Sequence, residues 1–184
     1  GCNQIFHNLV SNQKKNEMRT KYGLPERFLL YVGSIEKRKN VLTILKTIKD
    51  MKKQNLVIIG HGKSYKIKCK KFVEENNLSK RVFFLSNIQA REIAIIYQTA
   101  QIMIYPSIFE GFGIPILEAL FSKVPVITTK GGCFEEAGGP YSKYISPNSV
   151  KEMKKAIIEI QKSSVLKNEM ISKGIKHAQN FTDD

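Results

Sequence analysis

Two carboxylates with seven residues between them, Glu110 and Glu118, are the first candidates for a functional role in this sequence. Ile114, Leu117 and Phe121 stand at helical neighbour positions of Glu118, which predicts that this carboxylate lies on the apolar face of its helix. A carboxylate in that position needs a specific partner to offset its desolvation. The simpler alternative is a buried structural glutamate bonded to backbone amides.

The chain between the two carboxylates is predicted to turn and then enter a helix. An apolar run at 102–105 predicts a buried strand just before it. Gly111 and Gly113 permit a tight turn, and Pro115 suits the first turn of a helix, where proline loses no hydrogen bond. The free N–H groups at the start of that helix would point back into the loop, and such groups favour an anion.

A second loop, residues 33–40, begins at Gly33 and carries three adjacent cations that include Arg38 and Lys39. Asn40 is the predicted N-cap of the helix that follows. Arg38 and Lys39 therefore lie where a glycine turn and a helix N-terminus already favour anions, and arginine can hold a phosphate through two parallel bonds. A solvated charge run is the alternative interpretation.

Apolar runs alternate with amphipathic stretches along the chain, which predicts a sequence of strands and helices. Continuous apolar runs are typical of parallel strands that are covered on both faces. The order predicts an α/β fold with a doubly wound, right-handed, Rossmann-like parallel sheet. Five strands are expected, at 28–32, 56–59, 82–85, 101–105 and 126–128, with a helix after each of the first four and two further helices at about 149–160 and 164–179.

The length of 184 residues fits one domain. We expect residues 25–184 to form that domain. Residues 1–24 are expected to be an inter-domain lead-in that is irregular apart from a short helix ended by Gly23. The abrupt start at Gly1 suggests a piece excised from a longer protein.

The loops with unusual composition all leave strands on the same edge of the expected sheet. In an open parallel sheet, ligands bind beyond the carboxyl ends of the strands. A single glycine loop is weak evidence, but the convergence of several loops predicts a binding site there. These loops are 33–39, 60–62, 86–88, 107–113 and 129–132.

A formal net charge of +14 raises the question of an anionic partner. Many of the cations are spread lysines on polar helix faces, such as Lys46 and Lys49, without the interleaved aromatic residues of a single-strand binding surface. We therefore expect no nucleic acid partner and only a weak chance of contact with an anionic membrane surface. Cys2, Cys69 and Cys133 fit neither a disulfide framework nor a zinc site, which favours reduced thiols in the cytoplasm.

The segment Glu110-Gly111-Phe112-Gly113-Ile114-Pro115 with Glu118 resembles the E-x7-E signature of the family 4 retaining glycosyltransferases, the group 1 transferases. Further matching motifs run in order through the chain, which makes the resemblance specific. They are Tyr22-Gly23-Leu24-Pro25, Tyr31-Val32-Gly33, Arg38-Lys39-Asn40, Val124-Pro125-Val126-Ile127 and Glu135-Glu136-Ala137-Gly138-Gly139-Pro140. Those enzymes have two Rossmann-like domains across a cleft, the GT-B fold, and the matched part is the C-terminal, donor-binding half.

The resemblance implies a role for each candidate residue. Lys39 would contact the donor diphosphate after the turn at Gly33, with Arg38 as substitute for a family arginine at the position of Ser34. Glu110 would face the transferred sugar, as the catalytic carboxylate, and Glu118 would accept hydrogen bonds from the ribose. The backbone of Phe112, Gly113 and Ile114 would meet the phosphates, and the main chain of Ile88 would bond the base.

The resulting prediction is the donor-binding domain of a retaining glycosyltransferase that uses a nucleotide-diphosphate sugar and no metal or other cofactor. Its acceptor, a glycan or a lipid-linked glycan, would bind an N-terminal domain outside these 184 residues, so the chain alone is expected to transfer no sugar. Polysaccharide or glycoconjugate biosynthesis is the expected process, in the cytoplasm or against the inner face of the membrane. The alternatives are a sugar-nucleotide epimerase or phosphorylase of GT-B fold, and a non-catalytic basic binding module.

Overall fold

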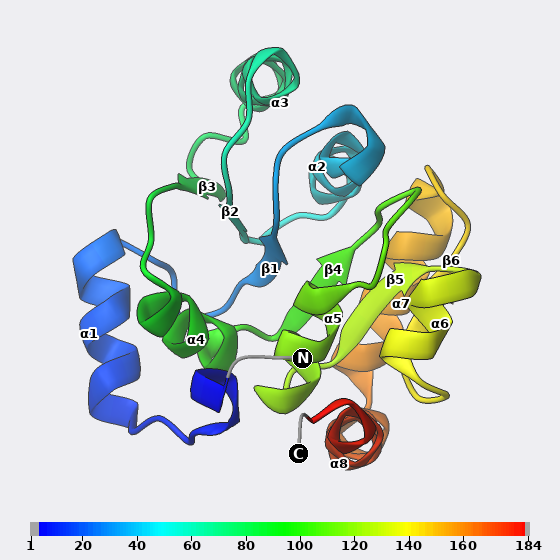
Figure 1. Ribbon diagram of the computed structural model, residues 1–184. Helices are drawn as coiled ribbons and strands as arrows, with labels where there is room; N and C mark the ends of the chain where they lie inside the picture. Colours follow the sequence, from blue (N-terminus) through cyan, green and yellow to red (C-terminus); the bar gives the residue numbers. More distant parts are fainter. Residues whose placement is uncertain (1–3, 183–184) are drawn as a thin grey trace.

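The computed structural model describes residues 4–182 and contains one parallel six-stranded sheet with the strand order β3-β2-β1-β4-β5-β6 (Figure 1). Every neighbouring pair of strands is parallel, so the carboxyl ends of all strands lie on one edge. The doubly wound α/β fold predicted from the sequence is thus confirmed. The strands are β1 (Leu29–Val32), β2 (Leu56–Ile59), β3 (Val82–Leu85), β4 (Ile102–Tyr105), β5 (Val126–Thr129) and β6 (Lys143–Ile145).

Helices cover both faces of this sheet. The α-helices are α1 (Asn12–Tyr22), α2 (Val41–Asp50), α3 (Ser64–Glu75), α4 (Ala90–Thr99), α5 (Ile114–Phe121), α6 (Gly132–Gly138), α7 (Val150–Lys162) and α8 (Ser164–Ala178), with short 3-10 turns η1 (Gln4–His7), η2 (Lys37–Lys39) and η3 (Gln179–Phe181). α2 packs against α3 and α7, whereas α5 packs against α4, α6 and α8 (Figure 1).

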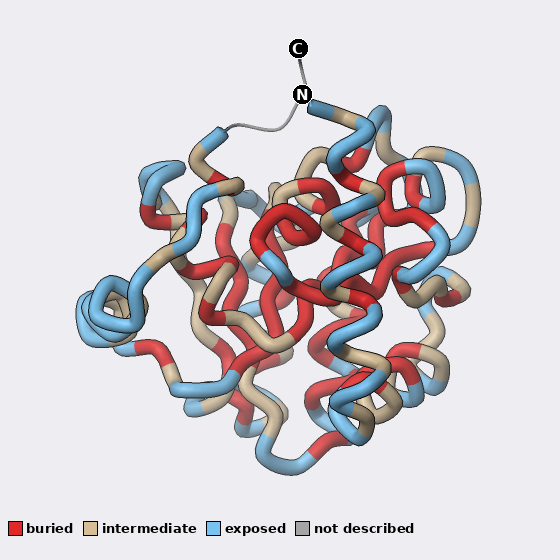
Figure 2. Tube along the Cα trace, turned by 90° about the horizontal axis from the view of Figure 1, so that it is seen from below, coloured by how far each residue is buried: buried red, intermediate tan, exposed pale blue. Residues whose placement is uncertain are grey.

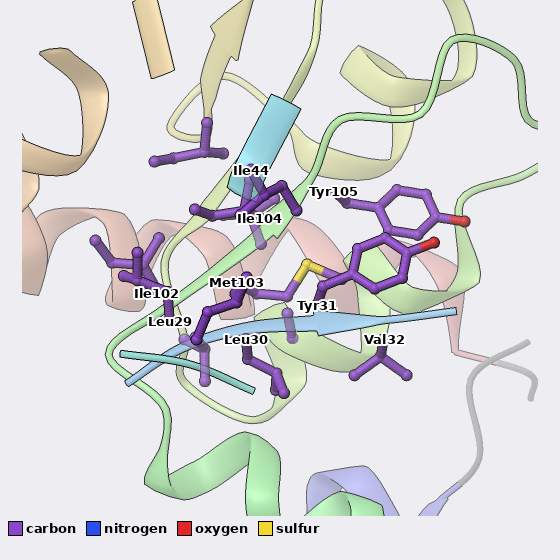
Figure 3. Close-up of a cluster of buried hydrophobic side chains, with 14 of the residues drawn as sticks. Leu29, Leu30, Tyr31, Val32, Ile44, Ile102, Met103, Ile104 and Tyr105 are labelled. Carbon is purple, nitrogen blue, oxygen red and sulfur yellow. The ribbon is translucent and has the colours of Figure 1, made fainter. Parts of the chain in front are cut away.

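The hydrophobic core sits on the central strands, whose residues are buried on both faces of the sheet (Figure 2). Leu29, Leu30, Met103 and Ile104 from β1 and β4 lie side by side in its centre (Figure 3). Burying a large aliphatic side chain contributes roughly 1.5–3 kcal/mol. Neighbouring β1 and β4 hold the two loops that carry the candidate site, so this packing fixes where those loops begin.

The strand predictions hold closely, but two elements between 130 and 146 were missed. β6 has only three residues, Lys143, Tyr144 and Ile145, of which only the last is buried, so the sequence shows no apolar run there. α6 has seven residues and begins at Gly132, directly after the N-cap Gly131. Such short elements depend on the strands beside them, here β5, rather than on their own periodicity.

The expectation of an irregular N-terminal segment is wrong for most of its length. Ser11 caps an eleven-residue helix, α1, and its hydroxyl accepts a hydrogen bond from Lys14 N–H. Gly23 ends the helix in the left-handed conformation, as the sequence predicted. Lys21 and Tyr22 both bond the buried Glu92 on α4 at 2.7 Å, so α1 is fastened to the domain. The role of this segment between two domains stays a prediction.

Cys69 and Cys133 carry free thiols, whereas Cys2 and Gly1 lie outside the described residues. None of the helices described between residues 4 and 182 is long and apolar enough to cross a bilayer.

Candidate active site

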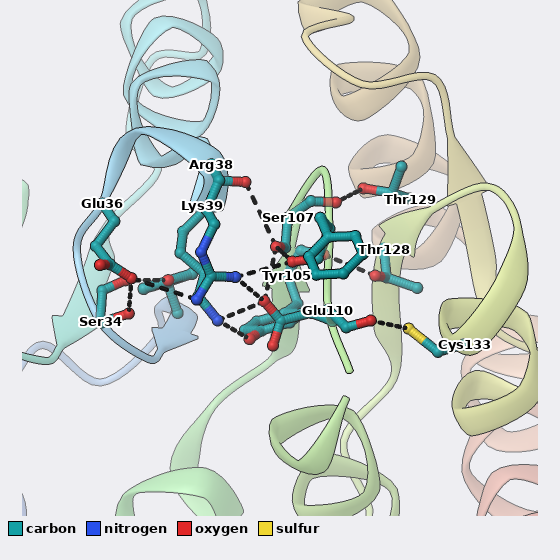
Figure 4. A network of polar contacts seen from close by, with 12 residues as sticks. Ser34, Glu36, Arg38, Lys39, Tyr105, Ser107, Glu110, Thr128, Thr129 and Cys133 are labelled. Carbon is teal, nitrogen blue, oxygen red and sulfur yellow. Dashed lines mark hydrogen bonds and ion pairs between the residues drawn. The ribbon is translucent and has the colours of Figure 1, made fainter. Parts of the chain in front are cut away.

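The loops after β1 and β4 meet at the carboxyl edge of the sheet, because these two strands are neighbours although they are far apart in sequence. The Ile108 N–H donates to the Arg38 carbonyl at 2.8 Å and joins the two loops directly. The side chains of Arg38, Lys39 and Glu110 converge at this junction (Figure 4).

Glu110 is the centre of this network. Its Oε2 accepts hydrogen bonds from Lys39 Nζ at 2.5 Å, from Arg38 Nη1 at 2.9 Å and from the Ser107 hydroxyl at 2.9 Å (Figure 4). Burial opposes ionisation of Glu110, but the bonds from Lys39, Tyr105 and Ser107 outweigh it and hold the pKa below the usual value. The carboxylate is therefore ionised at neutral pH and neutralises part of the charge of both cations.

Lys39 is a buried cation, with 6% of its surface exposed. Its Nζ also donates to the Tyr105 hydroxyl at 2.8 Å and lies 5.2 Å from the centre of that ring. Tyr31 stacks beside Tyr105, with ring centroids 5.8 Å apart, and burial raises the pKa of both phenols. Lys39 thus lies at the edge of the sheet as predicted, but in this structure its partner is the carboxylate of Glu110.

Arg38 is half exposed and lies at the open side of the junction. Its Nη1 also donates to the Phe109 carbonyl at 2.9 Å, and its Nη2 lies 3.5 Å from Glu36. Ser34, at the position of the family arginine, donates its hydroxyl hydrogen to Glu36 at 2.7 Å.

The loop between Glu110 and α5 turns as the sequence predicted, with one correction. Gly113 has φ +81°, in the region that favours glycine, and proline lies at the start of α5. Gly111 has no positive φ, and open space surrounds the position of a Cβ there, so nothing in the backbone requires glycine at 111. Phe112 is exposed, whereas Ile114 is half-buried.

Asn40 stands at the predicted N-cap of α2 but does not cap it with its side chain. The residue is left-handed, with φ +65°, and its N–H donates to the Lys37 carbonyl. The Asn40 Oδ1 accepts from the Thr43 hydroxyl at 2.9 Å rather than from a backbone N–H.

Glu118 lies between α5 and α4, where its partner is a side chain and not a backbone amide. The buried Tyr97 hydroxyl donates to Glu118 Oε1 at 2.9 Å. Desolvation raises the pKa of Glu118 to about 7, and the bond from Tyr97 opposes this only in part. A carboxyl that titrates near neutral pH is typical of a functional position rather than a structural one.

Gly33 and Ile88 take positions at the same edge. Gly33 has φ +149°, and the backbone of Gly60 approaches it so closely that a Cβ on Gly60 would lie 1.8 Å from the Gly33 carbonyl oxygen. Gly60 therefore fixes the spacing of the loops after β1 and β2, beside a cavity of about 550 Å³ that Ser34 and His61 help to line. Ile88 follows β3, two strands away from β1, and is half-buried.

Sequence reasoning missed three side chains that form hydrogen bonds with Glu110 or Glu118. Tyr97 bonds Glu118. The Ser107 hydroxyl bonds the Glu110 carboxylate, and the Cys133 thiol donates to the Glu110 backbone carbonyl at 3.1 Å (Figure 4). Cys133 and Tyr97 are more than twenty residues from their partners, so only the assembled sheet brings them together. Tyr97 gave one signal, a phenol on the apolar face of α4 that needs a buried partner.

His177 on α8 contacts the loop that follows α6. Its Nε2 lies 2.7 Å from the Glu136 carbonyl, within the matched motif that ends at Pro140. The His177 ring also fills the space beside Gly139, where a Cβ would lie 2.6 Å from it. α8 therefore packs against the loop after α6.

Comparison with known proteins gives a consistent result. Residues 14–177 match the family described as glycosyl transferases group 1. The O-antigen chain mannosyltransferase RfbU of Salmonella typhimurium is 33% identical over 137 residues, which cover 74% of this chain and 39% of that protein. The serotype-specific mannosyltransferase WbdA of Escherichia coli is 31% identical over 135 residues, or 71% of this chain and 17% of that protein. The chain thus spans less than half the length of these relatives.

Solved structures support the same fold. HepE from Anabaena, in complex with UDP and glucose, has a TM-score of 0.88 at 17% identity over 100% of this chain and 52% of that one. The C-terminal domain of a glycosyl transferase group 1 family protein, LpcC from Francisella tularensis, has a TM-score of 0.82 at 23% identity and covers 98% of this chain and 97% of its own. These likenesses show the fold, and the family match over residues 14–177 shows that the chain belongs to the group 1 glycosyltransferases.

Proposed function

We propose that this chain is the donor-binding domain of a retaining, family 4 glycosyltransferase that uses a nucleoside-diphosphate sugar. One observation carries the proposal: Arg38, Lys39 and Glu110 meet at the carboxyl edge of the sheet, in the loops beside the N-terminus of α5. Two cations and a helix N-terminus suit a diphosphate, and a carboxylate suits a sugar that gains positive charge.

The phosphate end of the donor would occupy this junction. Arg38 and Lys39 would bind the diphosphate oxygens, and the N–H groups of Phe112, Gly113 and Ile114 would complete the anion site at the start of α5. In this arrangement the diphosphate takes over the cations that Glu110 bonds in the structure described here. Glu110 is then available to the sugar.

The nucleoside end would extend toward α4 and β3. Glu118 would accept hydrogen bonds from the ribose hydroxyls, and the main chain of Ile88 would bond the base. The close approach of the Gly60 and Gly33 backbones holds the loops after β1 and β2 together, and the nucleotide would bind above these loops.

The mechanism that follows from these roles is dissociative and needs no metal ion. The anomeric C–O bond breaks toward the diphosphate, whose growing negative charge is held by Lys39, Arg38 and the α5 amides. The acceptor hydroxyl then attacks the oxocarbenium-like sugar from the same face and passes its proton to the departing diphosphate oxygen, so the configuration is retained. Glu110 stabilises the positive charge and orients the sugar.

The named relatives support a hexosyl, and first of all a mannosyl, donor for polysaccharide biosynthesis. The acceptor, a glycan or lipid-linked glycan, would bind a further domain outside these residues, with peripheral contact to the inner face of a membrane through exposed lysines such as Lys46. No nucleic acid takes part.

Thermal denaturation of the chain with UDP, GDP and their sugars tests donor binding, because a ligand that binds only the folded state raises the melting temperature. We expect one nucleoside diphosphate to stabilise the chain, and equally so in EDTA. Incubation of the chain with its donor and candidate acceptors should yield no transfer, whereas the full-length protein should transfer the sugar with retention. Stabilisation by none of the nucleotides would overturn the proposal.

A further inference from the structure

Tyr97 and Glu118 form a polar pair inside an interface that is otherwise apolar. Tyr97 has 0% of its surface exposed, and the Phe6 ring packs edge-on against it at 5.5 Å. Its hydroxyl lies 2.9 Å from Glu118 Oε1 and 3.3 Å from the Pro115 carbonyl oxygen. One phenol thus touches both the carboxylate and the first turn of α5.

The pair is costly for a purely structural contact. A carboxylate that leaves water needs a charged or multiply bonded partner, and Glu118 is bonded by a neutral phenol. No ion pair within residues 4–182 joins Glu118 to a lysine or arginine. A phenylalanine and a leucine at these positions would pack the same interface without that cost, so the pair indicates a constraint other than stability.

The geometry assigns the two oxygens of Glu118 different tasks. Oε1 is bonded by Tyr97, whereas Oε2 has no hydrogen-bond partner in the described chain, and the residue remains partly exposed. A carboxylate held through one oxygen loses rotational freedom, so the direction of its other oxygen is also restricted. Such an oxygen is suited to accept from a ribose diol.

We propose that Tyr97 is a positioning residue of the nucleotide site, which orients Glu118 and favours its ionised form without touching the ligand. The inference rests on the proposed function, because it assumes that Glu118 binds the ribose. Removal of the hydroxyl should release the Glu118 side chain and make its carboxylate harder to ionise, so nucleotide affinity should fall.

The other elements packed against α5 place no competing group on Glu118. His7 of η1 stacks on Phe121 at 3.8 Å, and Tyr105 of β4 accepts from Lys39. On α6, Glu135 accepts from the Gly131 N–H, and on α8, His177 lies against the Glu136 carbonyl. The proton affinity of Glu118 is therefore set by burial and by Tyr97.

The variant Tyr97→Phe tests the proposal, since it removes one oxygen and keeps the ring. We expect calorimetric titration with the preferred nucleoside diphosphate at pH 7 to show about tenfold weaker binding, the loss of one hydrogen bond to a charged group. The loss should shrink at pH 9, where Glu118 is ionised in both proteins. In a Glu118→Gln background, Tyr97→Phe should have less than about a twofold further effect.

Tyr22→Phe is the matched control, because Tyr22 bonds Glu92 at 2.7 Å in the same way but lies between α1 and α4. It should lower thermal stability without changing nucleotide affinity.

Carbon-13 NMR titration of Glu118 provides a readout without ligand: Tyr97→Phe should raise the pKa of that carboxyl. An unchanged Glu118 pKa, or equal affinity losses in the two phenylalanine variants, would overturn the positioning role. If no nucleotide binds the unaltered chain, the proposed function fails and the positioning of a ribose-binding Glu118 fails with it. A raised pKa alone would then show only a local hydrogen bond.

Discussion

Glu110→Gln should strengthen the binding of a nucleoside diphosphate that carries no sugar, although it removes the proposed catalytic carboxylate. In the structure, Glu110 holds the two cations that the diphosphate would need, at 2.5 Å from Lys39 and 2.9 Å from Arg38. An incoming diphosphate must displace this carboxylate. Glutamine keeps the shape and one acceptor oxygen but carries no charge, so the displacement becomes easier.

The expected gain follows from how exposed each contact is. The Lys39 and Glu110 side chains are 8% and 12% exposed, and close charge pairs in such settings couple by about 1.5–7 kcal/mol. The Arg38 side chain is 49% exposed, and an ion pair there is worth on the order of 0–1 kcal/mol. Part of the coupling is recovered by the amide, so we expect a gain of about 1.4 kcal/mol, which is tenfold in affinity.

Calorimetric titration of the chain with UDP and GDP at physiological salt measures this gain. Glu36→Gln is the control, because Glu36 is half exposed and lies 3.5 Å from Arg38. The diphosphate affinity of this variant should change by less than about twofold. In the full-length enzyme, the same Glu110→Gln change should lower turnover far more than donor affinity. Weaker or unchanged binding of the diphosphate by Glu110→Gln would refute competition between Glu110 and the ligand.

Two further predictions concern Lys39 and Glu118. Lys39→Ala should weaken diphosphate binding at least thirtyfold, because the loss of one partner of a charged contact costs roughly 2–5 kcal/mol. Lys49 is an exposed lysine on α2, and Lys49→Ala should change the affinity by less than about twofold. Equal small losses for the two variants in calorimetry would contradict the phosphate role of Lys39. Because the folded-state pKa of Glu118, about 7, lies above the ordinary 4.5, this carboxyl lowers stability as pH rises from about 4.5 to 7. Urea unfolding should therefore show that Glu118→Gln is more stable than the unaltered chain at pH 8, by on the order of 3 kcal/mol, and equally stable at pH 4. A stability difference that does not change with pH would argue against a raised pKa of Glu118.

The fold was predictable from the sequence because its signals are local. β2 and β3 coincide with apolar runs, and α5 begins where glycine and proline predict it. The left-handed Asn40 was not predictable from its preference for N-caps, since its conformation follows from the 3-10 turn η2 before it. β6 lacked an apolar run altogether.

The candidate site residues were named one by one from the sequence, but the contacts that the structure shows between them were not predicted. Lys39 and Glu110 are 71 residues apart, and they meet because β4 lies beside β1 in the sheet. The sequence favoured an anion beside Lys39, and the family resemblance implied a sugar beside Glu110, but neither indicated that each residue is the other's partner. The strand order is the missing information, and a doubly wound pattern of strands and helices permits more than one order.

This pairing changes where the binding energy of a donor must come from. With Glu110 ionised, the buried part of the junction holds one cation against one carboxylate and has little net charge to attract a diphosphate. The attraction that remains comes from the half-exposed Arg38 and from the N–H groups at the start of α5, which no carboxylate occupies. A diphosphate that docks on those groups first reaches Lys39 only as Glu110 leaves. Under the proposed function, donor binding and the release of Glu110, the proposed catalytic carboxylate, would become one event, so that Glu110 would meet the sugar only when the leaving group is already held.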